Sequence, residues 1–320
     1  MIMNLKLFDK HGEAQKNNFG FFEFESGLIE VSGTEAIQFL NGLITVDVKS
    51  IEVNRWKLAA FPNAQGRLLA VVRVLRLDEK FLFITEAQTR EKIFQNLFRF
   101  TYAGDFKVAD LTEKFACFAV RGSKIPKFKY KKPATDEITE AKFANDEDGF
   151  LIGAFRASGF EIFVPKIMKD DFADELKNLG AIEIDEQTRE VWRIENGVPK
   201  YGIDADETTI VPELGIEELI SYNKGCYIGQ EIIARIHFRG HIAKQLIGLI
   251  LEKNVAPNSE LKSLGGKNAG RITSVTFSPT FKKFIALAFV RYDFLAEGTE
   301  LKIGEITAAV KHLPFVGKIS

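Results

Sequence analysis

Cysteine is scarce in this chain, which holds only Cys117 and Cys226 among its 320 residues. Two cysteines so far apart exclude a disulfide framework and favour a reducing compartment. Neither sign of charge dominates, because 43 basic residues stand against 44 acidic ones. We therefore expect no overall basic field that would attract nucleic acid regardless of its sequence.

Long apolar runs are also absent. No run approaches the roughly 20 residues that a membrane-spanning helix needs, and Lys6, Asp9 and Lys10 interrupt the N-terminal segment before the apolar core of a signal peptide could form. There is no Walker loop and no GxGxxG at a strand-to-helix junction, so nucleotide binding of those kinds has no support. We expect a cytoplasmic protein that does not bind membranes.

The pattern of apolar residues indicates an α+β protein with a separate all-β part. Residues 27–48 predict a strand, a turn and a helix with Thr34 as its N-cap. Hairpin-connected strands and an amphipathic helix over Thr89 to Phe100 follow, so residues 32–110 form one α+β unit. From Leu246 onward strands dominate, with Gly and Pro between them, which predicts a separate small all-β domain.

A charged segment separates these regions. Lys124 to Gly149 is rich in Lys, Asp, Glu and Pro and has little periodicity, so we expect an exposed excursion. Its KFKYKK stretch alternates basic and aromatic residues as some nucleic-acid patches do, but the acidic run that follows nearly cancels its charge. A solvated loop accounts for the composition better.

Cys226 lies in NKGCYIGQEIIAR, just before a helix that we expect to begin near Gly229. Backbone N–H groups at that helix start and the charge of Lys224 would both favour thiolate over thiol. The thiol could then serve as a nucleophile or a soft metal ligand. The alternative is a small buried hydrophobe, which we expect for Cys117 in FACFAVR.

Protein-only metal binding has little support. His237 and His241 follow Cys226 at spacings that match no common zinc pattern, and Gly240 interrupts any helical face that they could share. We expect both histidines at the surface and no metal site.

A second candidate element is RIENGVPKYGID, where a helix carrying Arg193 and Glu195 ends in a Gly-Val-Pro break. A carboxylate near such an end can accept hydrogen bonds from a heterocycle with adjacent N–H and NH₂ donors, as pterins have. The alternative is a surface glutamate paired with Arg193 or Lys200.

KGCYIGQE at residues 224–231 is the signature of the YgfZ-type folate-binding proteins, relatives of the glycine-cleavage T-protein, and the chain resembles that family over nearly its whole length. Four further stretches support the resemblance: VSGTEAIQFLNGLITVDV, RIENGVPKYGID, GRITSVTFSP and KHLPF, in that order.

The resemblance implies a three-domain T-protein-like fold around a central channel. Its parts would be a discontinuous first domain of residues 1–31 and 111–240, an inserted α+β domain of residues 32–110, and a C-terminal β-barrel-like domain of residues 245–320. Tetrahydrofolate or a one-carbon derivative would occupy the channel, with Glu195 on the pterin. The resemblance places the other folate contacts and the functional motif at Arg193, Tyr227, Gln230, Glu231, Lys224 and Cys226.

One departure separates this chain from the T-protein enzymes. Those relatives carry an Asp-Asp pair just after the glycine turn of the inserted domain, where this chain has Leu69 and Ala70 in GRLLAVV. An apolar side chain can neither stabilise a developing cation nor relay a proton. The T-protein relatives in turn lack the KGC cysteine.

The resemblance therefore implies a tetrahydrofolate-binding accessory protein that supports the assembly or repair of iron-sulfur enzymes, including tRNA-modifying ones. The link to tRNA would be indirect, through a client enzyme, without contact to nucleic acid. Two alternatives stay open: a folate-dependent one-carbon transferase with Cys226 as nucleophile, and a cysteine that shares a cluster with a partner.

Overall fold

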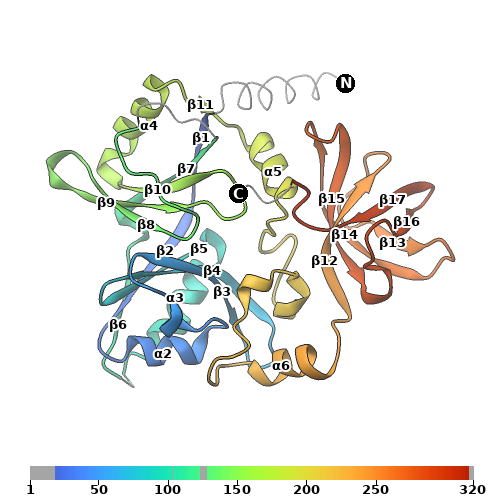
Figure 1. Ribbon diagram of the computed structural model, residues 1–320, viewed down its shortest axis with the longest axis horizontal. Helices are drawn as coiled ribbons and strands as arrows, with labels where there is room; N and C mark the ends of the chain where they lie inside the picture. The colour runs from blue at the N-terminus through green and yellow to red at the C-terminus, as the bar shows by residue number, and fades with distance from the viewer. Residues whose placement is uncertain (1–18, 103, 123–127, 317–320) are drawn as a thin grey trace. The chain divides into compact units, whose positions relative to one another are not determined.

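The computed structural model describes residues 19–102, 104–122 and 128–316. The chain divides into two compact units (Figure 1). Among the described residues, one contains 19–183 and 217–234, and the other contains 184–216 and 235–316. Residues 1–18, where the absence of a signal peptide is predicted, lie outside the described part of the chain. Within that part, no helix is both long and apolar enough to span a bilayer.

The first unit contains a five-stranded antiparallel sheet in the order β3-β4-β5-β2-β6. Two helices supply Leu40, Ile93 and Leu97 to its core. The predicted strands and helices of this region are confirmed. The elements are β2 (Ser26–Ser32), α2 (Ala36–Leu43), β3 (Arg55–Pro62), β4 (Leu68–Leu77), β5 (Lys80–Glu86), α3 (Arg90–Phe98) and β6 (Lys107–Asp110).

Two details of this region differ from the sequence-based expectation. The N-cap of α2 is Glu35, and Thr34 instead donates from Oγ1 to Asp105 Oδ2 at 2.7 Å, because the turn at Gly33 brings the two together. Strand β2 belongs to this sheet, although most of it precedes the expected boundary at residue 32. The three-domain boundaries themselves stay a prediction.

The same unit contains a six-stranded sheet in the order β11-β1-β7-β10-β9-β8, in which only β1 and β11 are parallel. Phe172 and Leu176 of α4 pack into the core of this sheet. The elements are β1 (Gly20–Phe24), β7 (Phe115–Arg121), β8 (Ile138–Lys142), β9 (Asp148–Gly153), β10 (Gly159–Pro165), α4 (Lys169–Asn178) and β11 (Ile182–Glu183).

The segment from Lys124 to Gly149 is not the plain exposed excursion that its composition predicts. Phe128 and Tyr130 pack against the core of the six-stranded sheet, and Ile138–Lys142 forms its edge strand β8. The alternation of lysine with aromatic residues thus reflects a half-buried chain. The first lysine of KFKYKK lies outside the described residues.

A buried charge cluster joins the two sheets. Glu161 on β10 accepts from Arg121 on β7 at 3.1 Å and pairs with Arg73 on β4 at 2.5 Å. Burial alone would raise the pKa of Glu161, but the two guanidinium groups hold it below the usual value. Removing Glu161 would leave two buried guanidinium groups without their counterion, so this carboxylate links the two sheets.

The second unit contains a closed barrel in the order β12-β15-β14-β13-β16-β17, which confirms the predicted all-β C-terminal part. Helix α5 packs on β14 and β15 and begins at Asp185, whose Oδ1 accepts from Thr188 N at 2.9 Å. The elements are α5 (Glu186–Glu195), β12 (Lys244–Leu251), β13 (Glu260–Ser263), β14 (Asn268–Ser278), β15 (Lys283–Arg291), β16 (Glu300–Ile303) and β17 (Ile306–Lys311).

Helix α6 (Gln230–Arg239) begins in the first unit and ends in the second. Its start at Gln230 agrees with the predicted helix after Gly229. Short 3-10 turns connect the longer elements: η1 (Val48–Ser50), η2 (Ala87–Thr89), η3 (Thr112–Lys114), η4 (Ala144–Asp146), η5 (Lys166–Met168), η6 (Val211–Leu214), η7 (Glu217–Leu219) and η8 (Tyr292–Phe294).

Candidate functional site

Glu195 is the last residue of α5 and is only 3% exposed. Its Oε1 accepts a short hydrogen bond from Ser278 Oγ, which in turn accepts from Phe281 N at 3.1 Å. The backbone carbonyl of Glu195 accepts from Phe315 N at 2.9 Å. The surface ion pair that composition allows is therefore excluded, and Glu195 is a buried carboxylate held between the end of β14 and the C-terminal segment.

The surroundings of this carboxylate are apolar. Its neighbour Ile194 belongs to a cluster of buried residues with Leu246, Ile285, Leu287, Phe289 and Phe315. Phe281 and Leu313 pack against the same cluster. A buried acceptor among apolar and aromatic side chains suits the donor edge of a flat heterocycle.

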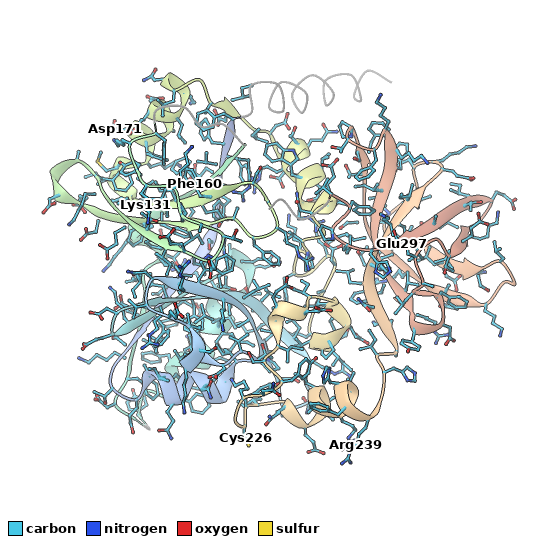
Figure 2. All side chains as sticks on the ribbon, viewed as in Figure 1. Lys131, Phe160, Asp171, Cys226, Arg239 and Glu297 are labelled. Carbon is cyan, nitrogen blue, oxygen red and sulfur yellow. The ribbon has the colours of Figure 1, made fainter. Side chains whose placement is uncertain are left out.

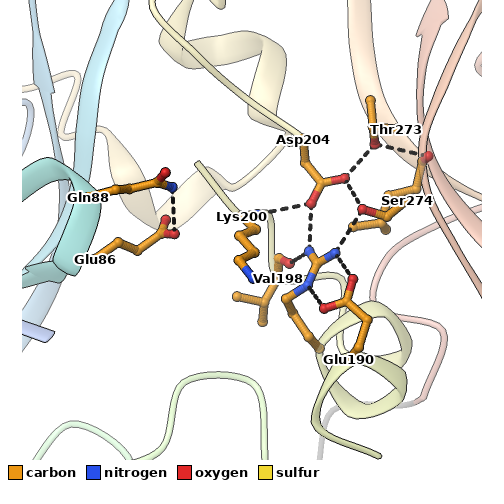
Figure 3. A network of polar contacts seen from close by, with 10 residues as sticks. Glu86, Gln88, Glu190, Val198, Lys200, Asp204, Thr273 and Ser274 are labelled. Carbon is orange, nitrogen blue, oxygen red and sulfur yellow. Dashed lines mark hydrogen bonds and ion pairs between the residues drawn. The ribbon is translucent and has the colours of Figure 1, made fainter. Parts of the chain in front are cut away.

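Arg193 is the centre of a polar network that links α5 to the barrel, and Figure 3 shows its partners Glu190, Val198, Asp204 and Ser274. Its Nε and Nη2 donate to both oxygens of Glu190, and Nη2 also donates to Ser274 Oγ at 2.8 Å. Nη1 donates to Val198 O and to Asp204 Oδ2, each at 2.6 Å. These bonds use all five N–H donors of the guanidinium group. Arg193 therefore supports the element that carries Glu195, and no donor remains for a ligand.

The electrostatics of the network agree with this role. Burial alone would lower the pKa of Arg193, but hydrogen bonds and ion pairs to Glu190 and Asp204 raise it above the usual value. Burial alone would raise the pKa of Glu190, but the hydrogen bonds and the charge of Arg193 lower it below the usual value. The network is thus charged and internally compensated.

The KGCYIGQE element lies in the other unit, against the C-terminal end of α2. Lys224 Nζ donates to the carbonyl oxygens of Asn41, Ile44 and Val46 at 2.8, 2.8 and 2.6 Å. Burial lowers the pKa of Lys224 to about 8, and Asp47 acts in the opposite direction. Three carbonyl oxygens use all three N–H donors of the ammonium group.

The two cysteines occupy opposite environments. Cys226 is exposed, and Figure 2 shows it at the periphery of the protein. Cys117 is buried on β7, where burial raises the pKa of its thiol to about 12 and Glu161 adds to the shift. The expectation that Cys117 is core is confirmed. The alternative for Cys226, a buried hydrophobe, is wrong, because the structure leaves this residue in solvent.

Residues after Cys226 are held firmly. Tyr227 is 9% exposed, and burial raises the pKa of its hydroxyl to about 12. Gly229 has a φ of +79°, and a Cβ there would lie 2.4 Å from Asn63 O, so only glycine allows this approach. Gln230 and Glu231 form the first turn of α6.

Leu69 and Ala70, the positions at which the resemblance implies missing carboxylates, lie on β4. Ala70 is fully buried in the core of the five-stranded sheet, and Leu69 packs against the same core. Neither position offers an acid or a base.

No group of three or more His, Cys, Asp or Glu side chains among the described residues could hold a metal ion. His237 and His241 are exposed, as predicted. His241 lies against the ring of Tyr292, with the ring centroids 4.4 Å apart.

The candidate residues therefore form two groups. Glu195 and Arg193 lie in the barrel-containing unit, and the other five lie in the unit with the two sheets: Lys224, Cys226, Tyr227, Gln230 and Glu231. Sequence reasoning missed Ser278, Ser274 and Asp204 as supporting residues. The two serines lie within GRITSVTFSP, and Asp204 is the last residue of RIENGVPKYGID. These stretches could have drawn attention to the three residues, but they do not show that the residues contact Arg193 and Glu195.

Two parts of the chain match known family models. Residues 8–137 match the GCVT N-terminal domain, and residues 244–316 match the glycine cleavage T-protein C-terminal barrel domain. The second match covers the closed barrel described above.

Whole-chain comparisons agree with these matches. The chain is 26% identical over 309 residues to an aminomethyltransferase of Thermoanaerobacter pseudethanolicus, covering 91% of this chain and 83% of that protein. It is 29% identical over 316 residues to one of Rubrobacter xylanophilus, covering 95% and 84%. The crystal structure of the glycine cleavage system aminomethyltransferase T of Bartonella henselae superposes with a TM-score of 0.84 at 20% identity, covering 98% of this chain and 90% of that one.

Proposed function

We propose that this chain, which has the glycine-cleavage T-protein fold with its N-terminal and barrel domains, is a tetrahydrofolate-binding accessory protein. In our account it supports the assembly or repair of iron-sulfur enzymes in the cytoplasm, including tRNA-modifying ones. One observation carries the proposal. The chain has the fold of the transferases, but the apolar residues Leu69 and Ala70 occupy the positions at which the resemblance places carboxylates in those enzymes. It also has an exposed thiol at Cys226.

Folate binding rests on the chemistry of Glu195. Its buried carboxylate lies at the end of α5 beside an apolar cluster with Phe315 and Phe289. A charged acceptor can take two parallel hydrogen bonds from the N–H and NH₂ donors of a pterin. The aromatic and aliphatic side chains would cover the faces of the ring. In this proposal Arg193 acts by positioning Glu195.

Tyr227, Gln230 and Glu231 are also proposed as folate contacts, because they present hydroxyl, amide and carboxylate groups at the start of α6. Reduced folate or a one-carbon derivative has matching polar groups along its length. The ligand would supply a one-carbon unit or a reduced pterin, while these side chains would bind and orient it.

Aminomethyl transfer is not part of the proposed function. The relatives that share the fold are named aminomethyltransferases. In this chain, however, the β4 positions that hold Leu69 and Ala70 present no group to stabilise a developing cation. The fold alone does not decide the activity.

Cys226 is the group that we assign to the iron-sulfur role, because it is an exposed thiol on a tightly held segment. Its exposure also favours a second candidate function, a folate-dependent one-carbon transferase with Cys226 as nucleophile. A cluster shared with a partner would need further ligands, since no metal-binding group exists among the described residues. Contact with nucleic acid or a membrane is not required in any of these accounts.

Two measurements separate the candidates. Purified protein incubated with isotopically labelled 5,10-methylenetetrahydrofolate should show binding without turnover, whereas the transferase account requires label to leave the folate. In cells that lack the endogenous protein, Cys226→Ser should fail to restore iron-sulfur enzyme activity. Cys117→Ser is the matched control and should restore it. Equal rescue by both variants would remove Cys226 from the function.

A further inference from the structure

The end of α2 depends on a distant part of the chain for its hydrogen bonds. The last four carbonyl groups of a helix lack partners within the helix. Leu40 O accepts from Ile44 N at 3.2 Å, but the next two carbonyls are satisfied by the KGC segment. Asn41 O accepts from Lys224 Nζ at 2.8 Å, and Gly42 O accepts from Ile228 N at 3.0 Å. The residues on either side of Cys226 thus cap this helix.

Lys224 does more than cap one carbonyl. Its other two donors reach Ile44 O and Val46 O, just beyond the helix end, so one ammonium group binds three carbonyl oxygens within residues 41–46. A positive charge is also favourable at a helix C-terminus, where the dipole is negative. The ammonium nitrogen lies 5.0 Å from the ring centroid of Tyr227, which adds a cation-π contact.

The residues before Lys224 are fastened to the same stretch. Leu219 O accepts from Thr45 Oγ1 at 2.5 Å, and Ser221 N donates to Thr45 O at 3.0 Å. Ser221 Oγ accepts from Asp47 N at 3.1 Å. On the far side, Gly229 packs against the turn at Asn63. Residues 219–229 are therefore bound along residues 41–66 on both sides of the cysteine.

Only the middle of this segment faces solvent without such contacts. A Cβ at Gly225 would meet nothing within 4 Å, and Cys226 is exposed. The thiol consequently lies in a pair of exposed residues, Gly225 and Cys226, between the anchor at Lys224 and the buried Tyr227. The anchors restrict where the sulfur can go without covering it.

We propose that Lys224 is a positioning residue, which holds Cys226 outward at a fixed place by binding the C-terminal end of α2. This inference rests on the proposed function of Cys226. It differs from a direct hydrogen bond to the thiolate, because all three donors of Lys224 are used by carbonyl oxygens. The role of the lysine is then to fix the position of the cysteine, because a functional group needs neighbouring residues that hold it in place.

Hydrogen exchange tests the anchors directly. In the wild-type chain, the amide of Ile228 should exchange at least 10-fold slower than that of Cys226. Lys224→Met keeps the length of the side chain but removes its donors, and should remove this protection while the amides of β4 and β5 stay unchanged. Lys49→Met is the matched control, because Lys49 lies on η1 near the same stretch with an exposed side chain. It should leave the protection of Ile228 intact.

Two outcomes of the exchange experiment would overturn the proposal. One is an Ile228 amide that exchanges without protection in the wild type. This measurement requires no variant, so it tests the proposal even if Lys224→Met fails to fold. The other is an unchanged Ile228 amide in folded Lys224→Met.

The alkylation rate of Cys226 against pH distinguishes positioning from activation. A positioning lysine predicts the same apparent thiol pKa in wild type and Lys224→Met, together with lost support of iron-sulfur enzymes in cells. A rise in the apparent pKa of the variant would contradict it. If Cys226→Ser itself keeps full support in cells, the proposed function fails, while the exchange data still decide the anchor.

Discussion

Arg193 and Asp204 form an ion pair in which Nη1 lies 2.6 Å from Oδ2, and the Asp204 side chain is fully buried. The other oxygen of Asp204 accepts from Thr273 Oγ1 at 2.5 Å and from Ser274 Oγ at 2.7 Å on β14. The pair therefore ties the loop after α5 to the barrel wall. Glu195 lies two residues from Arg193, so its position depends on this link.

Replacing Arg193 should destabilise the chain strongly. Arg193→Met would leave Asp204 buried without its counterion, which costs about 3–5 kcal/mol. Arg189→Met on the same helix removes a partly exposed pair with Glu186 and should cost about 0–1 kcal/mol. Urea unfolding of both variants measures the difference. Similar unfolding midpoints would show that the network contributes little.

Aminomethyl transfer should be absent from the purified protein. Leu69 and Ala70 supply no carboxylate, and Leu69→Asp should not create activity because the surrounding groups that would position it are also missing. A glycine-cleavage assay with the wild type and Leu69→Asp makes the check. Transfer by the wild type would refute the assignment.

Native-state alkylation should distinguish the two thiols completely. Cys226 is exposed and should react with iodoacetamide in the folded protein, whereas Cys117 is buried with a pKa near 12 and should react only after unfolding. Mass spectrometry of peptides with and without denaturant identifies the modified residue. Labelling of Cys117 under native conditions would mean that β7 opens readily.

The contribution of Lys224 to stability should depend on pH. Burial lowers its pKa from 10.5 to about 8, so between these values the unfolded chain binds the proton that the folded chain has released. The contribution of Lys224 to the free energy of unfolding therefore rises as the pH rises from about 8 to 10.5. Asp47 opposes the shift, and Tyr227 does not titrate there because its pKa is raised to about 12.

Unfolding free energies of wild type and Lys224→Met at the two ends of this window check the sign. The difference between them should grow in favour of the wild type as the pH rises, with Lys49→Met as the control for loss of one charge. A difference that shrinks instead would show that the three carbonyl oxygens stabilise the ammonium form by more than burial destabilises it.

Periodicity predicted most elements because each buries one face. The alternation in RLLAVVRVLRL gave β4, the helical spacing in DDFADELKNLG gave α4, and the C-terminal strands gave the barrel. It failed for β8, since the flanking Lys, Asp and Glu residues obscure a strand whose burial comes from its neighbour β9. It also misplaced the N-cap of α2, because Thr34 finds Asp105 from another part of the chain.

The candidate site was predictable in its residues but not in their contacts. The matched stretches named Glu195, Arg193, Lys224 and Cys226. The sequence could not show that all N–H donors of Arg193 bond to other residues of the chain. Asp204 and Ser274 are distant in sequence and come close to Arg193 only in the folded chain. In the same way, the partners of Lys224 are backbone carbonyls of residues 41–46, which no pattern of side chains reveals.

Titration of the purified protein with tetrahydrofolate tests the central claim most directly. The wild type should bind in a saturable manner, and Glu195→Gln should weaken binding about 10-fold or more, because losing charge-assisted hydrogen bonds costs about 1.5–3 kcal/mol. Ser278→Ala, which removes a neighbour of the carboxylate but not the carboxylate itself, is the control and should weaken binding less. No binding by the wild type, or an unchanged Kd for folded Glu195→Gln, would contradict the account.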